Sequence, residues 1–180
     1  MERIEKQIEV EAPLRAVYNQ WTQFEEFPRF MEGIKLVRQL DDTHLHWQAD
    51  IGGRDVEWDA EIIDQTPDRR IVWRSTSGAR NGGKVEFEAL GETRTRVLVV
   101  MEYDPDGAIE HLGGALGLPA RRVEGDLERF KKFIESRGTE TGEWRGEVHR
   151  RQKVSDGQGY GADAGPPSAA VYPRKGGGGD

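Results

Sequence analysis

Apolar and polar residues alternate in seven segments of the first 104 residues, a pattern typical of half-buried β-strands. In segment 45–51 the apolar phase is partly aromatic, and segment 56–62 repeats the pattern with acidic residues in the polar phase. The same alternation occurs in 3–10, 34–40, 70–76, 85–89 and 97–103. The connections between the later segments are short turns rich in Gly, Asn, Asp and Pro, so we expect an antiparallel sheet.

Helical periodicity marks three further segments. A short amphipathic helix is expected after Pro13, and a second one at 25–31. A long C-terminal helix is expected from about Asp106 to Arg137 with a kink near Pro119, because the apolar stripe keeps its phase on both sides of that proline. Four glycines should weaken the half that precedes Pro119.

A curved sheet wrapped around the long helix would bury the apolar faces of both. We therefore predict an α+β domain over residues 1–138, with about six to seven antiparallel strands and two short helices after the first strand. The charged extension 139–153 is expected to dock on this domain with Trp144 as its anchor. Residues 154–180, rich in Gly, Ala and Pro, are expected to be disordered.

Composition narrows the classes of function. The chain has 26 Lys and Arg, 33 Asp and Glu, a net charge of −7 and no cysteine. Disulfides, thiolate zinc sites and cysteine nucleophiles are thereby excluded, and an acidic domain disfavours nucleic acid as a partner. No apolar run approaches the roughly 20 residues of a membrane-spanning helix, and the first residues do not resemble a secretory signal, so a cytoplasmic location is expected.

Three tryptophans, Trp47, Trp58 and Trp73, fall in the inward phase of their strands. They either fill the core against the long helix or line a pocket, and periodicity alone leaves both interpretations open. The acidic residues that alternate with the apolar ones in the second of these strands are expected to form a solvated face: Asp55, Glu57, Asp59 and Glu61.

Few polar side chains are expected to face the interior. Tyr103 continues the inward phase of the last strand, and Arg74 or Ser75 should face inward whichever way their strand is turned. These three are the candidate polar groups of a pocket, and no catalytic residue is assigned. His44 and His46 lie on one side of a strand without an evident third ligand, so neither a metal nor a cofactor is expected.

Several segments together resemble the START-like, or SRPBCC, superfamily. These are 8–13, Val17-Tyr18-x-x-Trp21, 24–31 and 124–130. The resemblance covers residues 1–138 and is greatest for the polyketide cyclase/dehydrase branch, which includes coenzyme-Q-binding START domains. It implies a helix-grip fold with an internal cavity between the sheet and the long helix, usually occupied by an apolar or aromatic ligand.

The resulting hypothesis is a carrier or sensor that encloses a hydrophobic or aromatic small molecule, such as a lipid, a quinone or a polyketide. The residues expected to line its cavity are Trp47, Trp58, Trp73, Phe87, Val99, Met101, Tyr103, Leu112, Leu116 and Val123. One alternative is a cyclase/dehydrase-type enzyme that uses the same cavity, and another is a protein-interaction module with a filled core. Transient contact with a membrane and the oligomeric state stay open.

Overall fold

The computed structural model describes residues 2–51, 53–104 and 118–150, which belong to one compact unit spanning Met1–Arg150. Its elements in chain order are β1 (Glu2–Val10), α1 (Leu14–Trp21), the 3₁₀ helix η1 (Phe24–Arg29), β2 (Ile34–Gln39), β3 (His44–Ile51), β4 (Arg54–Thr66), β5 (Arg70–Gly78), β6 (Asn81–Gly91), β7 (Arg94–Tyr103), α2 (Leu118–Arg137) and β8 (Val148–His149). The expected tail, 154–180, lies outside the described residues.

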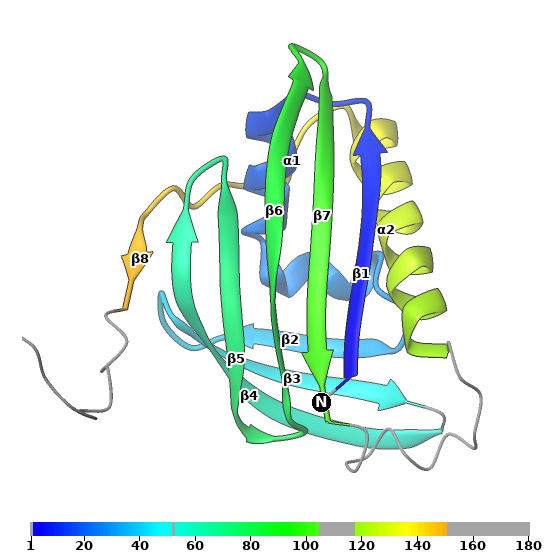
Figure 1. The fold of residues 1–180 in the computed structure, drawn as a ribbon, viewed down its shortest axis with the longest axis vertical. Coiled ribbons are helices and arrows are strands. Elements are labelled where there is room, and N and C mark those ends of the chain that lie inside the picture. The colour runs from blue at the N-terminus through cyan, green and yellow to red at the C-terminus, as the bar shows by residue number, and fades with distance from the viewer. Residues whose placement is uncertain (1, 52, 105–117, 151–180) are drawn as a thin grey trace, which may run out of the picture. The chain divides into compact units, whose positions relative to one another are not determined.

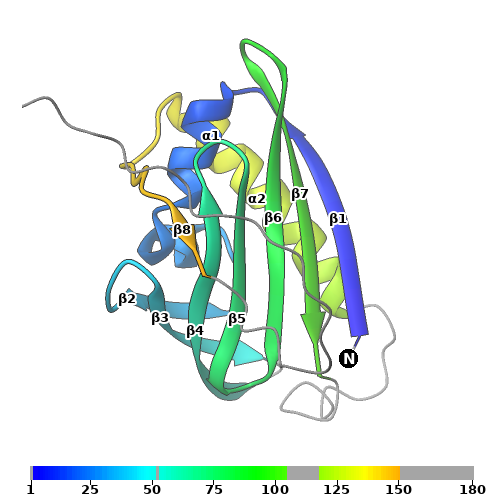
Figure 2. The ribbon, with the colours of Figure 1, turned by 60° about the vertical axis from the view of Figure 1, so that its left-hand side comes forward.

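The long strands form a curled antiparallel sheet in the order β1-β7-β6-β5-β4-β3-β2. The first strand pairs with the last long one, Ile4 opposite Met101, while the strands between them follow one another through short turns. The sheet curls so that β2 and β3 cross the direction of β6 and β7 (Figure 1). Figure 2 shows α2 behind β6 and β7, on the concave side, and α1 behind the ends of β4 and β5. The predicted helix-grip architecture is confirmed.

Helix α2 packs through one apolar stripe. Leu127, Phe130 and Ile134 are each at most 3% exposed, as their common helical face predicts. The first half of the predicted helix, before Leu118, lies outside the described residues. The kink expected near Pro119 therefore stays a prediction. The second short helix is a 3₁₀ helix that contains Pro28, a residue without a backbone donor.

Aromatic side chains join the short helices to α2. The ring of Phe130 lies 4.9 Å from that of Trp21 and 5.2 Å from that of Phe30, centroid to centroid, and both contacts are edge-on. Phe27 packs against Trp21 at 5.7 Å. Edge-on contacts of this kind add to the stability gained by burying the rings, so this cluster fixes where α2 crosses the sheet.

Residues 139–150 run back over α1 and β4. The side chain of Gln20 and Thr141 exchange two hydrogen bonds, of 2.9 and 3.0 Å, and the backbone N–H of Trp144 donates to the hydroxyl of Thr22. Strand β8 then pairs with Asp64 and Gln65 of β4. β3 ends its pairing with β4 at Glu61, which leaves that edge of β4 available to β8.

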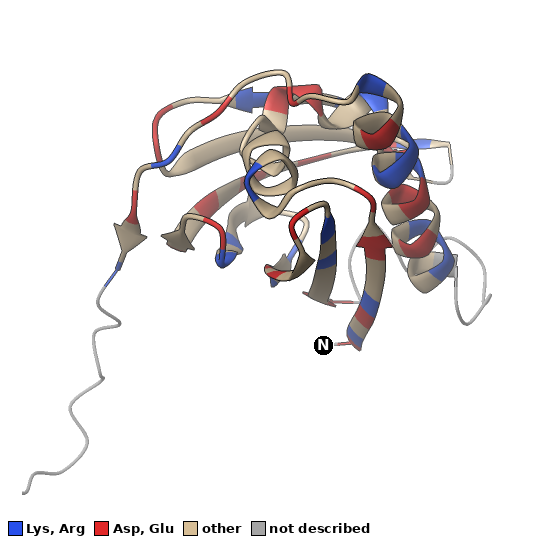
Figure 3. Cartoon of the chain, turned by 90° about the horizontal axis from the view of Figure 1, so that it is seen from above, with Lys and Arg blue, Asp and Glu red and all other residues tan. Residues whose placement is uncertain are grey.

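The prediction that Glu61 belongs to a solvated face of β4 is wrong. Glu61 is only 6% exposed, because the guanidinium groups of Arg74 and Arg150 both contact its carboxylate. Burial of a carboxylate is tolerated where cations pair with it. Most other charged residues in the described part of the chain are at least partly exposed, and both signs occur along α2 and β1 (Figure 3).

Candidate functional site

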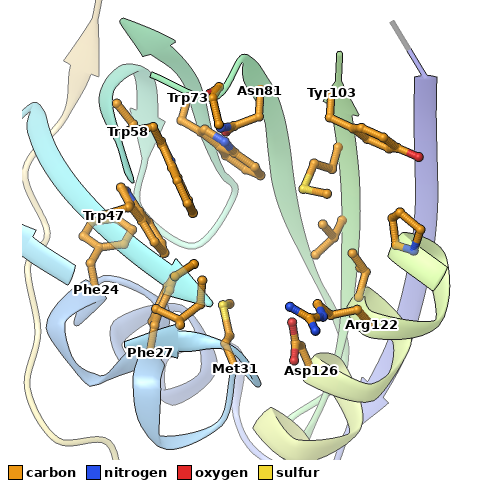
Figure 4. A pocket seen from close by; sticks show the side chains of 18 of the residues that line it. Phe24, Phe27, Met31, Trp47, Trp58, Trp73, Asn81, Tyr103, Arg122 and Asp126 are labelled. Carbon is orange, nitrogen blue, oxygen red and sulfur yellow. The ribbon is translucent and has the colours of Figure 1, made fainter. Parts of the chain in front are cut away.

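A cavity of about 570 Å³ lies between the sheet, η1 and α2. Its volume is within the range typical of small-molecule sites, about 300–1,000 Å³. Most of its wall is apolar and is formed by Trp21, Phe24, Phe27, Met31, Ile34, Leu45, Trp47, Ile51, Trp58, Ile62, Ile71, Trp73, Val99, Met101, Val123 and Leu127. Figure 4 shows the three tryptophans of the sheet on one side of this space and side chains of α2 on the other.

Tryptophans form the sheet side of the cavity. Trp47 and Trp58 are opposite each other on β3 and β4, and their rings are stacked with centroids 5.5 Å apart and planes 9° apart. Trp73 of β5 lies over Gly83 of β6, where a Cβ atom would come within 3.0 Å of its ring. The indole Nε1–H of Trp47 is buried and has no acceptor among the described residues. This wall therefore offers flat apolar surfaces and one unused donor.

Most of the residues expected in the cavity border it, and one does not. Those that border it are Trp47, Trp58, Trp73, Val99, Met101, Tyr103 and Val123. Phe87 instead packs edge-on against Tyr18 at 5.4 Å and Trp21 at 6.0 Å, because α1 covers that end of β6. Leu112 and Leu116 lie outside the described residues.

Neither Arg74 nor Ser75 lines the cavity, contrary to expectation. Arg74 is on the outer face of β5, where its side chain is 57% exposed and pairs with Glu61. The hydroxyl of Ser75 accepts a hydrogen bond of 3.0 Å from the backbone N–H of Asn81. Ser75 still pairs with Ala60, which lines the cavity, because the register of β5 against β4 shifts only beyond this pair, towards Ser77.

Tyr103 does border the cavity, but its hydroxyl is already engaged. It donates a hydrogen bond of 2.6 Å to the carboxylate of Glu2, and the residue is 4% exposed. Burial, followed by the hydrogen bond and negative charge of Glu2, raises the pKa of Tyr103 to about 12. The phenol therefore stays protonated at neutral pH and closes the wall between β7 and β1.

This pKa predicts a loss of stability in alkali. Because the unfolded chain ionises Tyr103 at its ordinary pKa of 10.0, the stabilising contribution is complete below pH 10 and disappears as pH rises towards about 12. We expect Tyr103→Phe to lose less free energy of unfolding over this interval than the unmodified protein. Urea denaturation at several pH values measures the slopes, and equal slopes for the two proteins would contradict the assignment.

The polar end of the cavity was missed by sequence reasoning. Arg122 and Asp126, one turn apart on α2, both line it and point towards the side where the tryptophans lie (Figure 4). Asp126 accepts hydrogen bonds from the guanidinium of Arg129 and, at 2.9 Å, from the backbone N–H of Glu32. Burial nevertheless raises the pKa of Asp126. A signal was available, since both residues adjoin the apolar stripe at Val123 and Leu127.

The two histidines considered as metal ligands each contact a carboxylate. His44 Nδ1 lies 2.9 Å from Asp41 Oδ1, and His46 Nδ1 lies 2.7 Å from Asp59 Oδ1. Within residues 2–51, 53–104 and 118–150, no group of three or more His, Asp or Glu side chains is arranged to hold a metal ion. No helix in the described part of the chain is long and apolar enough to cross a membrane.

Comparison with known proteins gives one family and several relatives. Residues 10–132 match the model of the family described as polyketide cyclase/dehydrase and lipid transport. An uncharacterised 17.2 kDa protein of Streptomyces lincolnensis is 48% identical over 149 residues, which cover 82% of this chain and 99% of the relative. The family match includes the residues that line the cavity, and the match to the relative spans almost the whole of that protein.

Two solved structures share the fold. The Zhui aromatase/cyclase of a Streptomyces species aligns with a TM-score of 0.62 and 16% identity. The alignment covers 79% of this chain and 99% of the Zhui chain. A START superfamily protein from Mycobacterium smegmatis aligns with a TM-score of 0.58 and 18% identity over 75% and 95% of the two chains. The predicted START-like architecture is confirmed by these neighbours, which at such identities inform about the fold alone.

Proposed function

Because this chain belongs to the polyketide cyclase/dehydrase and lipid transport family, we propose that it encloses an apolar or aromatic small molecule in the cavity beneath α2. The observation that carries the proposal is the cavity of about 570 Å³ with stacked tryptophans on one wall. Desolvation of flat apolar surface supplies the affinity of such a site. The protein then acts as a carrier or sensor of its ligand.

The experiment has two parts. Native mass spectrometry and solvent extraction of the purified protein should detect a bound apolar molecule. The emptied protein should bind naphthylmethanol, a neutral planar probe, with quenching of tryptophan fluorescence. An extract without any apolar compound, together with no binding of the probe, would overturn the proposal.

Removing one of the stacked rings should weaken this binding. We expect Trp58→Ala to raise the dissociation constant for naphthylmethanol about tenfold, because a stacking surface and its buried area are lost together. Trp144→Ala is the matched control, since Trp144 lies in the extension over α1 and does not border the cavity. Isothermal titration calorimetry measures both constants, and equal weakening by the two substitutions would place the binding elsewhere.

A cyclase/dehydrase-type enzyme is the second candidate, favoured by one observation. Asp126 has a side chain that is only 16% exposed, and burial raises its pKa. It lies one turn from Arg122 at the cavity, an arrangement that can transfer a proton to a bound carbonyl compound. Against it, the polar residues singled out by sequence are either outside the cavity or already hydrogen-bonded. Turnover of a poly-β-ketone mimic that Asp126→Asn abolishes would favour the enzyme over the carrier.

A further inference from the structure

The ionisable groups of the cavity are unevenly partnered. Those that border it are Glu32, Arg80, Arg121, Arg122 and Asp126, apart from the phenol of Tyr103. The carboxylate of Asp126 is contacted by Arg129, and Glu32 lies 3.6 Å from the same guanidinium. Arg129 therefore compensates both acids of this end of the cavity, and Arg80 pairs with Asp104 at 3.8 Å. Within the described part of the chain neither Arg121 nor Arg122 forms an ion pair, but Arg121 is exposed, whereas Arg122 is partly buried.

Arg122 lies one turn from Asp126, and its charge acts on that carboxylate from beyond ion-pair distance. Among the described residues its guanidinium forms no ion pair, and its one hydrogen bond is a long contact of 3.4 Å from Nη1 to the backbone oxygen of Asp50. Arginine is always protonated and presents five donors in a planar fork. Most of these donors are available to a molecule in the cavity.

The local backbone leaves room for this guanidinium. Gly33, between η1 and β2, has φ +83°, and a Cβ atom there would lie 2.6 Å from Arg122 Nη1. The side chain thus extends from α2 towards the turn before β2 and lies across the end of the cavity. Its position is set by contacts on both sides, the helix and the Gly33–Asp50 backbone. The guanidinium of Arg122 is consequently held in place beside the apolar wall of the cavity.

We propose that the ligand of this cavity is an amphipathic acid, whose carboxylate or comparably acidic oxygen binds Arg122 while its apolar body lies against Trp47 and Trp58. The inference rests on the proposed binding function and adds the chemical class of the ligand. Guanidinium and carboxylate form two parallel charge-assisted hydrogen bonds, which are stronger within a poorly solvated site than in water. Neutral molecules of the same shape gain the apolar contacts alone.

The test compares two probes that differ in one substituent, naphthoate and naphthylmethanol, with the substituent on the same ring carbon. The unmodified protein should bind naphthoate at least about tenfold more tightly. R122Q should remove this preference. It should raise the dissociation constant for naphthoate about tenfold and change that for naphthylmethanol by less than about twofold. R122K keeps the positive charge but not the planar guanidinium donors, so it should raise the dissociation constant for naphthoate by an intermediate factor.

K132Q is the matched control, because Lys132 is an exposed cation on the same helix and does not border the cavity. It changes the net charge equally and should leave both dissociation constants unchanged. Circular dichroism and thermal unfolding of each variant establish that α2 is intact.

The outcomes separate this inference from the proposed function. Equal affinity for the two probes, or equal weakening of both by R122Q, would overturn the assignment of an acidic ligand while the cavity remained a binding site. Equal effects of R122Q and K132Q on the dissociation constant for naphthoate would mean that the preference arises from long-range charge alone. That result would also overturn the assignment of an acidic ligand. Failure of both probes to bind would overturn the proposed function and this inference together.

Discussion

Replacing Phe130 by alanine should lower the free energy of unfolding by about 3–5 kcal/mol, the range for large aromatic residues removed from a packed core. Phe130 is 0% exposed and contacts the ring of Trp21 in α1 at 4.9 Å and that of Phe30, which directly follows η1, at 5.2 Å. Neither ring can move into the vacated space without leaving its own contacts. The loss is a large part of the roughly 5–15 kcal/mol that stabilises an ordinary domain.

Urea denaturation followed by tryptophan fluorescence and circular dichroism measures this change. Leu40→Ala is the control, because Leu40 is 59% exposed and its truncation should alter the free energy by less than about 0.5 kcal/mol. Phe130→Leu, which keeps most of the volume, should fall between the two. A loss below about 1 kcal/mol for Phe130→Ala would mean that the aromatic cluster does not fix α2 on the sheet.

A single methyl group at Gly83 should be nearly as disruptive. The added Cβ would lie 2.2 Å from the backbone oxygen of Val100 and 2.9 Å from the ring of Trp73. The first atom belongs to the neighbouring strand β7, so relief requires a shift of the sheet itself. We expect Gly83→Ala to lower the free energy of unfolding by about 3 kcal/mol, the upper end for overpacking.

The same substitution should affect the cavity, because the displaced Trp73 ring forms part of its wall. Binding of naphthylmethanol is expected to weaken several-fold in the folded variant. Gly91→Ala, in the same strand, is the control: no atom lies within 4 Å of its Cβ position, and the change should stay within about 1 kcal/mol. Equal effects of the two substitutions on stability would show that close approach at Gly83 is not the cause.

Errors of the sequence interpretation have a common origin. Alternation indicates on which face of a strand a residue lies but does not indicate what covers that face. Phe87 has the inward phase, yet α1 rather than the cavity covers it. Glu61 has the outward phase, yet Arg150, 89 positions further along the chain, covers it. Both outcomes depend on contacts between distant segments, which no local pattern encodes.

The polar end of the cavity depends on distant contacts in the same way. Arg122 and Asp126 adjoin the apolar stripe of α2, which a helical projection can reveal. Their partners cannot be read in this manner, because Asp126 is bonded by the backbone of Glu32 and Arg122 lies against Gly33 and Asp50. That Arg122 forms no ion pair with any described residue was therefore decided by where α2 crosses the segments that contain Gly33 and Asp50.

By itself, the sequence determined the order of the elements, the antiparallel sheet, the apolar face of α2 and the inward tryptophans, since each follows from a short-range period in residue type. Only the tertiary structure decided that these faces leave a cavity rather than close on one another, and that Arg122 borders it without an ion pair to any described residue. The physical reason is that periodicity sets the direction of a side chain, whereas packing between segments far apart in the chain sets its surroundings.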